Sequence, residues 1–189
     1  MPKFHKLPGW PAFSNQEAIA VSNVIKSNRV NYWTGNECKE FEKEFSKFAD
    51  SKYSISLSNG TVALELALIA LDIQKGDEII VTPRSFIASA SSVVNIGGKP
   101  IFSDVDPLTG NITARFIKEK ITKKTKAIVC VHLGGMPCEM DEIMSIAKQN
   151  NLFVIEDCAQ AHGATYKGKS VGTFGDIGAW SFCQDKIIT

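Results

Sequence analysis

A lysine near the end of the sequence combines a reactive side chain with a position that suits chemistry. Lys186 comes four residues after Phe182, and the apolar residues from Ile177 to Phe182 predict a strand. An amine that is desolvated near another cation has a lowered pKa and becomes nucleophilic, so it can form a Schiff base with a carbonyl group. A solvated surface lysine is the usual case at such a place. The sequence therefore makes Lys186 a candidate nucleophile and leaves a surface role open.

Two carboxylates follow another apolar run. Glu156 and Asp157 come directly after a strand predicted from Leu152 to Ile155. An acid in this position can hold a proton on a heterocyclic nitrogen of a bound ligand. Two acids at a helix N-terminus, or a pair of metal ligands, are the alternatives. His162, a few residues further on, is more typical of a hydrogen-bonded structural histidine than of a catalyst.

A short polar segment predicts an anion site. Ser58-Asn59-Gly60-Thr61 lies between a predicted strand and a predicted helix. Unpaired N–H groups at a helix N-terminus favour a phosphate, Gly60 permits its close approach, and Thr61 adds a hydroxyl donor. Ordinary capping of the helix by Ser58 or Asn59 is the simpler alternative.

These three groups need elements that bring them together. Strands are predicted over residues 53–57, 78–81, 100–103, 127–131, 152–155 and 177–182, and helices over residues 61–71, 85–95, 113–121 and 140–150. Strands in continuous apolar runs that alternate with helices indicate an α/β fold, with a mainly parallel sheet covered on both faces. Ligands bind beyond the carboxyl ends of such strands, where the three groups are expected.

We divide the chain into an N-terminal helical segment, residues 1–50, and an α/β sheet region, residues 51–189. Ser14 and Glu17 form a predicted capping box at the start of a first helix. A second helix is predicted from about Glu37, with three phenylalanines on one face. Both helices are expected to dock on something else rather than to stand alone. Tyr166-Lys167-Gly168-Lys169 predicts a hairpin turn.

Composition excludes several classes of function. Lys plus Arg number 21 and Asp plus Glu 20, so the net charge of +1 gives no broad reason to expect nucleic acid or an anionic membrane as a partner. No apolar run approaches the length of a membrane span, and Met1 to Lys6 lack the apolar core of a signal peptide, which makes a cytoplasmic location the expectation. The five cysteines form no C-x-x-C pair and the histidines number three, so no metal site is predicted.

Five motifs follow one another in an order that is more specific than any of them alone. They are Ser58-Asn59-Gly60-Thr61-Val62-Ala63-Leu64, Pro83-Arg84-Ser85-Phe86, Val131-His132-Leu133-Gly134-Gly135, Glu156-Asp157-Cys158-Ala159-Gln160 and Ser181-Phe182-Cys183-Gln184-Asp185-Lys186. Nearly the whole chain thereby resembles the DegT/DnrJ/EryC1/StrS aminotransferases, enzymes of fold type I that use pyridoxal 5'-phosphate (PLP). Two departures are Gly134-Gly135, where the family often has an aromatic residue, and Arg84, where a small residue is commoner.

The resemblance implies a role for each site residue. Lys186 would form the Schiff base with PLP, and Asp157 would pair with the pyridine nitrogen. Gln160 would hydrogen-bond the ring's phenolic oxygen, and Phe86 would stack on the ring face. The phosphate would be held by three residues, namely Gly60, Thr61 and Ser181.

The resemblance also implies a reaction and partners. An amino group would move from a donor, usually glutamate in this family, to a nucleotide-linked keto sugar, in amino-sugar or surface-polysaccharide biosynthesis. The family continues beyond its lysine with further strands and a small C-terminal domain, and each site is completed by a second subunit. We therefore expect residues 1–189 to be an incomplete PLP-binding large domain, inactive alone, and the full-length protein to be a homodimer.

Three alternatives remain at the level of sequence. A sugar dehydratase of the same family carries His in place of the lysine, so Lys186 argues against it. A non-catalytic or regulatory protein, or an inactive fragment, would share the fold without the activity. A generic nucleotide-binding domain would need a G-x-G-x-x-G or G-x-x-x-x-G-K-[ST] loop, and neither opens a helix here.

Overall fold

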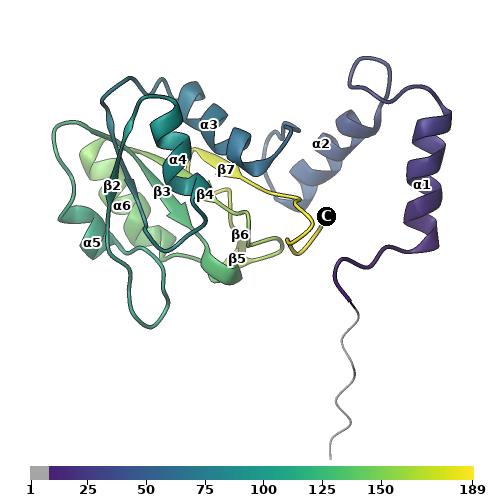
Figure 1. The fold of residues 1–189 in the computed structure, drawn as a ribbon. Helices are drawn as coiled ribbons and strands as arrows, with labels where there is room; N and C mark the ends of the chain where they lie inside the picture. The colour runs from purple at the N-terminus through teal and green to yellow at the C-terminus, as the bar shows by residue number, and fades with distance from the viewer. Residues whose placement is uncertain (1–8) are drawn as a thin grey trace, which may run out of the picture.

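A parallel sheet forms the centre of the protein (Figure 1). The computed structural model describes residues 9–189, so the expectation for Met1 to Lys6 lies outside the described residues. Five strands lie in the order β2-β1-β3-β4-β7, and each neighbouring pair is parallel. Their bounds are β1 Glu78–Val81, β2 Lys99–Phe102, β3 Thr125–Val131, β4 Phe153–Asp157 and β7 Ile177–Ala179. The predicted α/β class with a mainly parallel sheet is confirmed.

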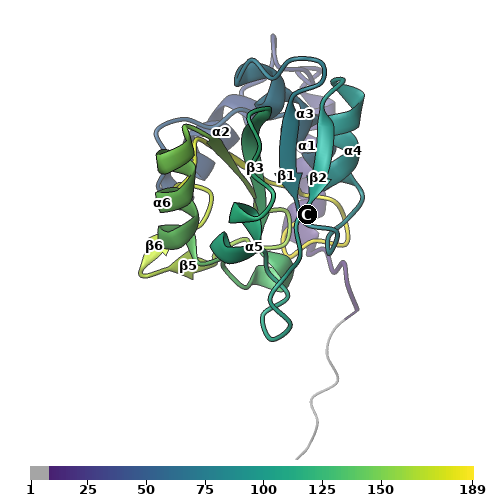
Figure 2. The same ribbon diagram turned by 90° about the vertical axis from the view of Figure 1, so that its left-hand side faces the viewer.

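Helices cover both faces of this sheet, as Figure 2 shows. Helices α3 (Gly60–Ala70) and α4 (Ala88–Asn95) pack on one face, and α5 (Ala114–Lys118) and α6 (Met140–Asn150) pack on the other. A single 3-10 turn, η1 (Leu133–Gly135), follows β3. Among the described residues, no helix combines the length and apolar composition that a membrane span requires.

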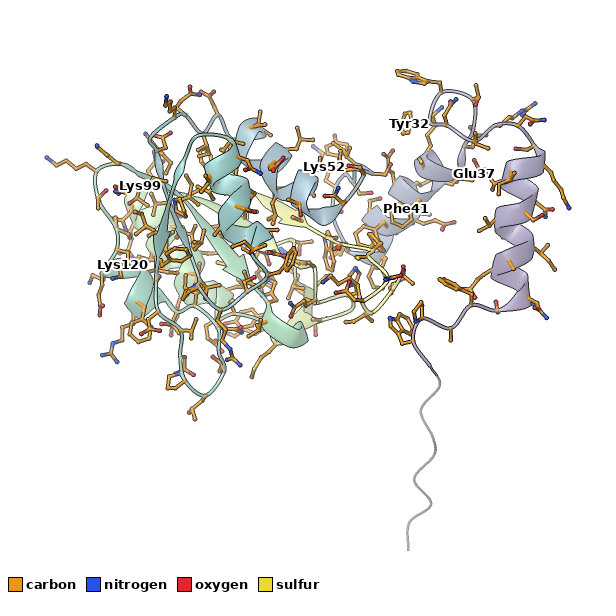
Figure 3. The ribbon with its side chains drawn as sticks, in the orientation of Figure 1. Tyr32, Glu37, Phe41, Lys52, Lys99 and Lys120 are labelled. Carbon is orange, nitrogen blue, oxygen red and sulfur yellow. The ribbon has the colours of Figure 1, made fainter. Side chains whose placement is uncertain are left out.

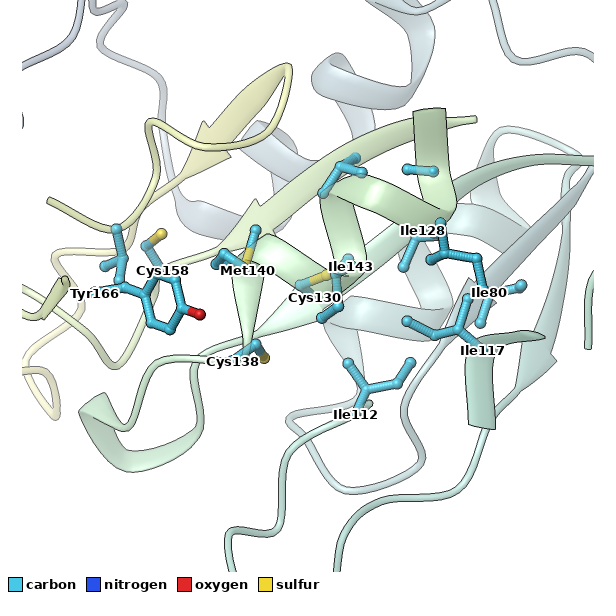
Figure 4. Close-up of a cluster of buried hydrophobic side chains, with 14 of the residues drawn as sticks. Ile80, Ile112, Ile117, Ile128, Cys130, Cys138, Met140, Ile143, Cys158 and Tyr166 are labelled. Carbon is cyan, nitrogen blue, oxygen red and sulfur yellow. The ribbon is translucent and has the colours of Figure 1, made fainter. Parts of the chain in front are cut away.

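Alternation along each strand divides the core into two clusters. Ile79 packs with α3 and α4, whereas the next residue, Ile80, packs with α5 and α6 in the cluster drawn in Figure 4. Successive side chains of a strand point to opposite faces, which is why consecutive apolar residues fill both clusters. The same alternation sends Glu156 and Asp157, adjacent in β4, to opposite faces of the sheet.

The strand order contains a reversal that creates a crevice. The chain leaves β1 for β2 on one side of it and then returns to place β3 on its other side. Loops that leave neighbouring strands in opposite directions open a space beyond their carboxyl ends, and ligands bind there in sheets of this kind. The crevice therefore lies at the carboxyl ends of the strands, where the site residues are predicted.

One predicted strand is wrong. Residues 53–57 are extended but pair with no strand, and Tyr53 and Ile55 are mostly exposed. The segment is held by α2 (Glu37–Phe48) instead: the Ser54 hydroxyl donates to the Glu42 carbonyl, and Ser56 donates its N–H and its hydroxyl to the Glu42 carboxylate. A strand needs a neighbouring strand to pair with its backbone N–H and C=O groups. Among the described residues this segment has no such neighbour and forms hydrogen bonds with Glu42 of α2 instead.

Three other predicted elements are shorter in the structure than the sequence pattern predicts. The helix predicted from Ser85 begins at Ala88, because Thr82 Oγ1 accepts from the Arg84 N–H and forms a turn before it. The last strand ends at Ala179 rather than Phe182, since its partner β4 ends at Asp157, which pairs with Ala179. The helix predicted over residues 113–121 is also shorter, and forms α5.

The two N-terminal helices differ in how they dock. The capping box of α1 (Asn15–Lys26) is confirmed, yet none of its residues is buried, and it stands apart from the sheet region in Figure 1. Helix α2, which carries Phe41 in Figure 3, packs on the C-terminal segment instead. Phe41 stacks edge-on against Phe182, and Phe45 against Trp180, at centroid distances of 5.2 and 5.3 Å. Docking is therefore confirmed for α2, whereas α1 buries none of its residues in the described chain and its docking stays a prediction.

The predicted hairpin turn is confirmed. Strands β5 (Thr165–Tyr166) and β6 (Lys169–Ser170) pair antiparallel, and Lys167 and Gly168 join them with φ values of 51° and 81°. Two successive positive φ angles define the type I′ turn that two-residue hairpins favour, which explains glycine at the second position.

Candidate active site

A cavity of about 210 Å³ opens at the carboxyl ends of β1, β3, β4 and β7. All seven residues predicted from the sequence motifs line it: Gly60, Thr61, Phe86, Asp157, Gln160, Ser181 and Lys186. They come from helix α3, from the loop after β1, from β4 and its loop, and from the segment after β7. A wider open groove between α5 and α6 contains none of them.

The N-terminus of α3 forms one wall. Asn59 caps the helix by accepting from the Val62 N–H at 2.9 Å, so the capping alternative is correct. The N–H groups of Gly60 and Thr61 nevertheless find no acceptor among the described residues. A Cβ placed on Gly60 would lie 2.9 Å from the Ser181 Cβ, so only glycine lets Ser181 approach the helix start this closely. Unpaired N–H groups beside a hydroxyl make a cradle suited to an anion.

Asp157 forms the buried end of the cavity. It is 6% exposed and points to the face that carries α3 and α4. Its Oδ2 accepts from the Ser89 hydroxyl at 2.7 Å, and its Oδ1 accepts from the Ala159 N–H at 3.2 Å. Burial raises the pKa of Asp157 above its ordinary value, and the Ser89 hydrogen bond opposes that rise. The carboxylate is thus desolvated, held by two donors, and open to a cationic partner from the cavity.

Lys186 reaches the same cavity from the C-terminal segment. Its side chain is 15% exposed, and Nζ lies 3.3 Å from Oδ2 of the exposed Asp185. The positive charge of Lys186 is near enough to Asp157 to help lower the pKa of that carboxyl group. An amine largely removed from water and directed at the cavity is placed to react with a carbonyl group there.

Gln160 and Phe86 complete the lining. Gln160 Oε1 accepts from the Gly134 N–H at 2.8 Å, and this bond fixes the side chain against the turn η1. Gly134 and Gly135 both have positive φ, so the departure from the family at these positions forms a tight glycine turn. Phe86 is mostly exposed beside the cavity.

Arg84, the second departure, lies outside the cavity lining and packs over Gly110. A Cβ on Gly110 would fall 1.6 Å from Arg84 Nη1. Glycine at position 110 therefore makes room for the guanidinium.

Glu156 has a structural position that the sequence did not reveal. It is fully buried on the opposite face from Asp157, and its carboxylate accepts from His132 Nε2 at 3.0 Å. Three backbone N–H groups of the loop before β7 also donate to it, at 2.7 to 2.8 Å, from Gly172, Phe174 and Gly175. Burial alone would raise the pKa of Glu156, but these hydrogen bonds together lower it.

The metal-ligand alternative for Glu156 does not fit the donor set. His132, Glu156 and Cys158 offer ligand atoms within 4.8 Å of one another. However, His132 Nδ1 accepts from the Cys138 N–H, so Nε2 carries the proton that goes to Glu156. Burial raises the pKa of the Cys158 thiol well above its ordinary value. With the imidazole lone pair engaged and the thiol protonated, the three side chains do not offer a set of free ligands, and His132 and Glu156 form a hydrogen-bonded pair instead.

His162 packs between aromatic rings, with centroids 5.3 Å from Trp180 and 5.1 Å from Phe182. Burial lowers its pKa, so the ring is held neutral among apolar neighbours. The predicted structural role fits this position, but the predicted hydrogen bonding is wrong, because both ring nitrogens are buried without a hydrogen-bond partner among the described residues.

Replacing Glu156 by alanine should destabilise the fold by about 3–5 kcal/mol, because the buried His132 and three part-buried backbone N–H groups would lose their shared acceptor. Urea unfolding at pH 7 measures this, with the exposed Glu44→Ala as the matched control. Since the folded pKa of Glu156 is lowered, its contribution is present above its unfolded value and is lost as the pH falls through the folded value. Equal stability of the two variants at pH 7 would contradict the network.

The fold is that of the PLP-dependent aminotransferases, a class in which solved structures include PLP and PMP forms. An aminotransferase from Psychrobacter cryohalolentis superimposes with a TM-score of 0.96 at 66% identity, covering 97% of this chain and 47% of that chain. NtdA of Bacillus subtilis, solved with the cofactor PMP bound, superimposes with a TM-score of 0.85 at 35% identity, covering 93% of this chain and 40% of that one. The fold class predicted from the sequence is thereby confirmed.

The chain belongs to the DegT/DnrJ/EryC1/StrS aminotransferase family, which it matches over residues 11–189. GDP-perosamine synthase of Escherichia coli O157:H7 is 48% identical over 179 residues, which are 95% of this chain and 49% of that protein. The chain spans about half the length of the curated relatives it matches. The family identified from the motifs is confirmed, whereas the role of each site residue stays a prediction.

Proposed function

We propose that the protein is a PLP-dependent aminotransferase that moves an amino group, from glutamate as donor, to a nucleotide-linked keto sugar. The observation that carries the proposal is the convergence of three chemically distinct groups on one cavity. These are the unpaired N–H groups of α3, the buried carboxylate of Asp157 and the shielded amine of Lys186. An anion, a protonated ring nitrogen and a carbonyl carbon are the features of PLP that those groups would meet.

The residues of the cavity fit this cofactor. Gly60, Thr61 and Ser181 would hold the phosphate, since glycine leaves the helix start open and the two hydroxyls add donors. Phe86 would cover one ring face, and the Gln160 amide, whose oxygen is taken by Gly134, would present its NH₂ group to the phenolic oxygen. Bound PLP would supply an electron sink that stabilises negative charge on the amino-bearing carbon.

Two side chains would act directly on the bound cofactor, namely Lys186 and Asp157. Lys186 would attach the cofactor and, once displaced by the amino donor, would carry a proton between the substrate carbon and the cofactor carbon. Asp157 would keep the ring nitrogen protonated, because an ionised carboxylate in a desolvated site favours a neighbouring cation. His132 and Glu156, on the other face of the sheet, would fix β3 and the loop before β7 without touching the ligand.

The relatives support the class of substrate. GDP-perosamine synthase is named for an amino sugar joined to a nucleotide, and it aligns with nearly all of this chain. We infer a nucleotide-linked keto sugar as acceptor on that basis, in amino-sugar or surface-polysaccharide biosynthesis. A homodimer, as the family resemblance implies, and the cytoplasmic location expected from the sequence are part of the same proposal.

The proposal is tested by cofactor binding and amino transfer. The protein should develop a visible absorption band when titrated with PLP, and glutamate should convert that band to the PMP form. A panel of GDP-, dTDP- and UDP-linked keto sugars should then restore it, with one sugar preferred. Binding without exchange would favour the non-catalytic alternative, and no binding would contradict the proposal.

Both residues 1–189 and the gene product read to its stop codon should be measured in parallel, together with their size in solution. This comparison tests the expectations of an inactive 189-residue chain and of a dimeric full-length protein.

A further inference from the structure

A line of two hydroxyl groups leads from the cavity to the buried carboxylate. Ser85 lines the cavity, and its Oγ lies 2.7 Å from Ser89 Oγ. Ser89 Oγ in turn lies 2.7 Å from Asp157 Oδ2. Ser89 is 1% exposed, so water does not compete for these bonds. Ser89 lies in the first turn of α4, and Ser85 lies in the turn that precedes the helix, where its hydroxyl faces that of Ser89.

The direction of the hydrogen bonds follows from the charge on Asp157. An ionised carboxylate can only accept, so the single Ser89 proton must go to Asp157. Ser89 is then left with lone pairs alone, and Ser85 must donate to it. Each donor strengthens the next bond in such a chain. The oxygen of Ser85 remains an acceptor at the cavity wall.

Few other groups act on this carboxylate. Among the described residues, Ser89 is the one side chain that donates to Asp157, and the Ala159 N–H is the backbone donor at the longer distance of 3.2 Å. The positive charge that acts on it is that of Lys186, since His132, in the loop after β3, is neutral with Nδ1 accepting from the Cys138 N–H. Hydrogen bonds to both oxygens fix the plane of the carboxylate. They thereby also fix the directions of the lone pairs that remain free.

We propose that Ser89 is a positioning residue that holds the Asp157 carboxylate ionised and correctly oriented, with Ser85 extending the hydrogen-bond chain to the cavity wall. The effect on Asp157 stands on the structure itself, and the consequence for cofactor binding rests on the proposed function. Removing the hydroxyl leaves the carboxylate equally buried but with a single backbone donor. The protonated, neutral form of Asp157 should then be favoured, so the pKa of Asp157 should rise.

Helix α4 supplies a matched control. Ser92 lies three residues after Ser89, is also 1% exposed, and its hydroxyl has no hydrogen-bond partner among the described residues. Ser92→Ala therefore deletes the same buried atom from the same helix without removing a bond to Asp157. Ser89→Thr keeps the hydroxyl and tests for rescue.

The first experiment measures Asp157 directly and does not need the cofactor. Protein labelled with ¹³C at the aspartate carboxyl carbon is titrated by NMR, and the Asp157 signal is assigned by its loss in Asp157→Asn. Loss of a hydrogen bond to a charged group should raise the Asp157 pKa by about one unit in Ser89→Ala. Ser92→Ala should leave that pKa unchanged, and Ser89→Thr should restore it. An unchanged pKa in Ser89→Ala, or an equal shift in Ser92→Ala, would overturn the proposal.

The second experiment adds PLP and separates this inference from the proposed function. If the wild-type protein binds PLP, Ser89→Ala should weaken the affinity about tenfold, the factor that corresponds to a shift of one pKa unit. Ser92→Ala should bind as the wild type does, and equal weakening in both would also overturn the proposal. If the wild type binds no PLP, the proposed function fails, while the NMR titration still decides the role of Ser89.

Discussion

Replacing Lys186 by alanine should abolish the visible absorption band that PLP acquires when attached to the protein, and should lower amino transfer at least about 10³-fold. One amine is proposed both to attach the cofactor and to carry the proton, so its removal takes away two functions together. The side chain is 15% exposed and lines the cavity with Asp157, and no alanine can substitute for it. Absorbance titration and a coupled transaminase assay measure the two losses.

Controls for this variant are available on the same chain. Lys120, an exposed lysine labelled in Figure 3 that does not line the cavity, should be replaceable by alanine with no change in either measurement. Borohydride reduction followed by mass spectrometry of peptides should find the cofactor on Lys186 alone. If Lys186→Ala keeps the absorbance and full activity, attachment occurs at another residue and the assignment is wrong.

The sheet was predictable from local pattern wherever a strand has at least one neighbour to pair with. Residues 78–81 and 140–150 fold as the strand and helix that their apolar pattern predicts, with the same bounds. In residues 53–57 apolar and polar side chains alternate, which also predicts a strand, yet this segment pairs with no other strand. A strand depends on a neighbour that is distant in sequence, and pattern alone cannot show whether that neighbour is present.

The site was predictable as a set of positions and not as a set of contacts. Each motif ends a strand or begins a helix, so parallel topology alone brings the seven residues to one edge. The partners of the two acids depend instead on the pleat of β4 and its register, which pairs Glu156 with Cys130 and Asp157 with Val131. The sequence Glu-Asp does not show the pleat or the register. For this reason Ser89 was not predicted as the partner of Asp157, nor His132 as the partner of Glu156.

The pleat also explains why two neighbouring acids differ in pKa. Glu156 meets four donors on one face, and its pKa is lowered despite burial. Asp157 meets one hydroxyl and one backbone N–H on the other face, and its pKa is raised because burial dominates. One acid is therefore satisfied within the protein, while the other keeps capacity for a partner that enters the cavity. Perturbed groups with spare capacity in a cavity are typical of functional sites.

Asp157→Asn should separate function from stability in the protein. Activity should fall by roughly 10²–10³-fold, since the variant loses the negative charge that holds a proton on the ring nitrogen. Some PLP should stay bound, because the proposed phosphate site and Lys186 are unchanged. A chelator should have no effect on the wild type, and loss of activity on chelation would support the metal alternative instead.

The stability of Asp157→Asn against unfolding should rise, whereas its activity should fall. A carboxyl group whose folded pKa is raised destabilises the fold above that pKa, where it is ionised in both states, and the penalty disappears as the pH falls below its unfolded value. Asn keeps an acceptor for the Ser89 hydroxyl and carries no charge. The cofactor-free variant should therefore need more urea to unfold than the wild type at pH 7, and the difference should vanish in acid. A variant that is both inactive and less stable at pH 7 would make Asp157 a structural residue, and the cavity would then need another partner for the ring nitrogen.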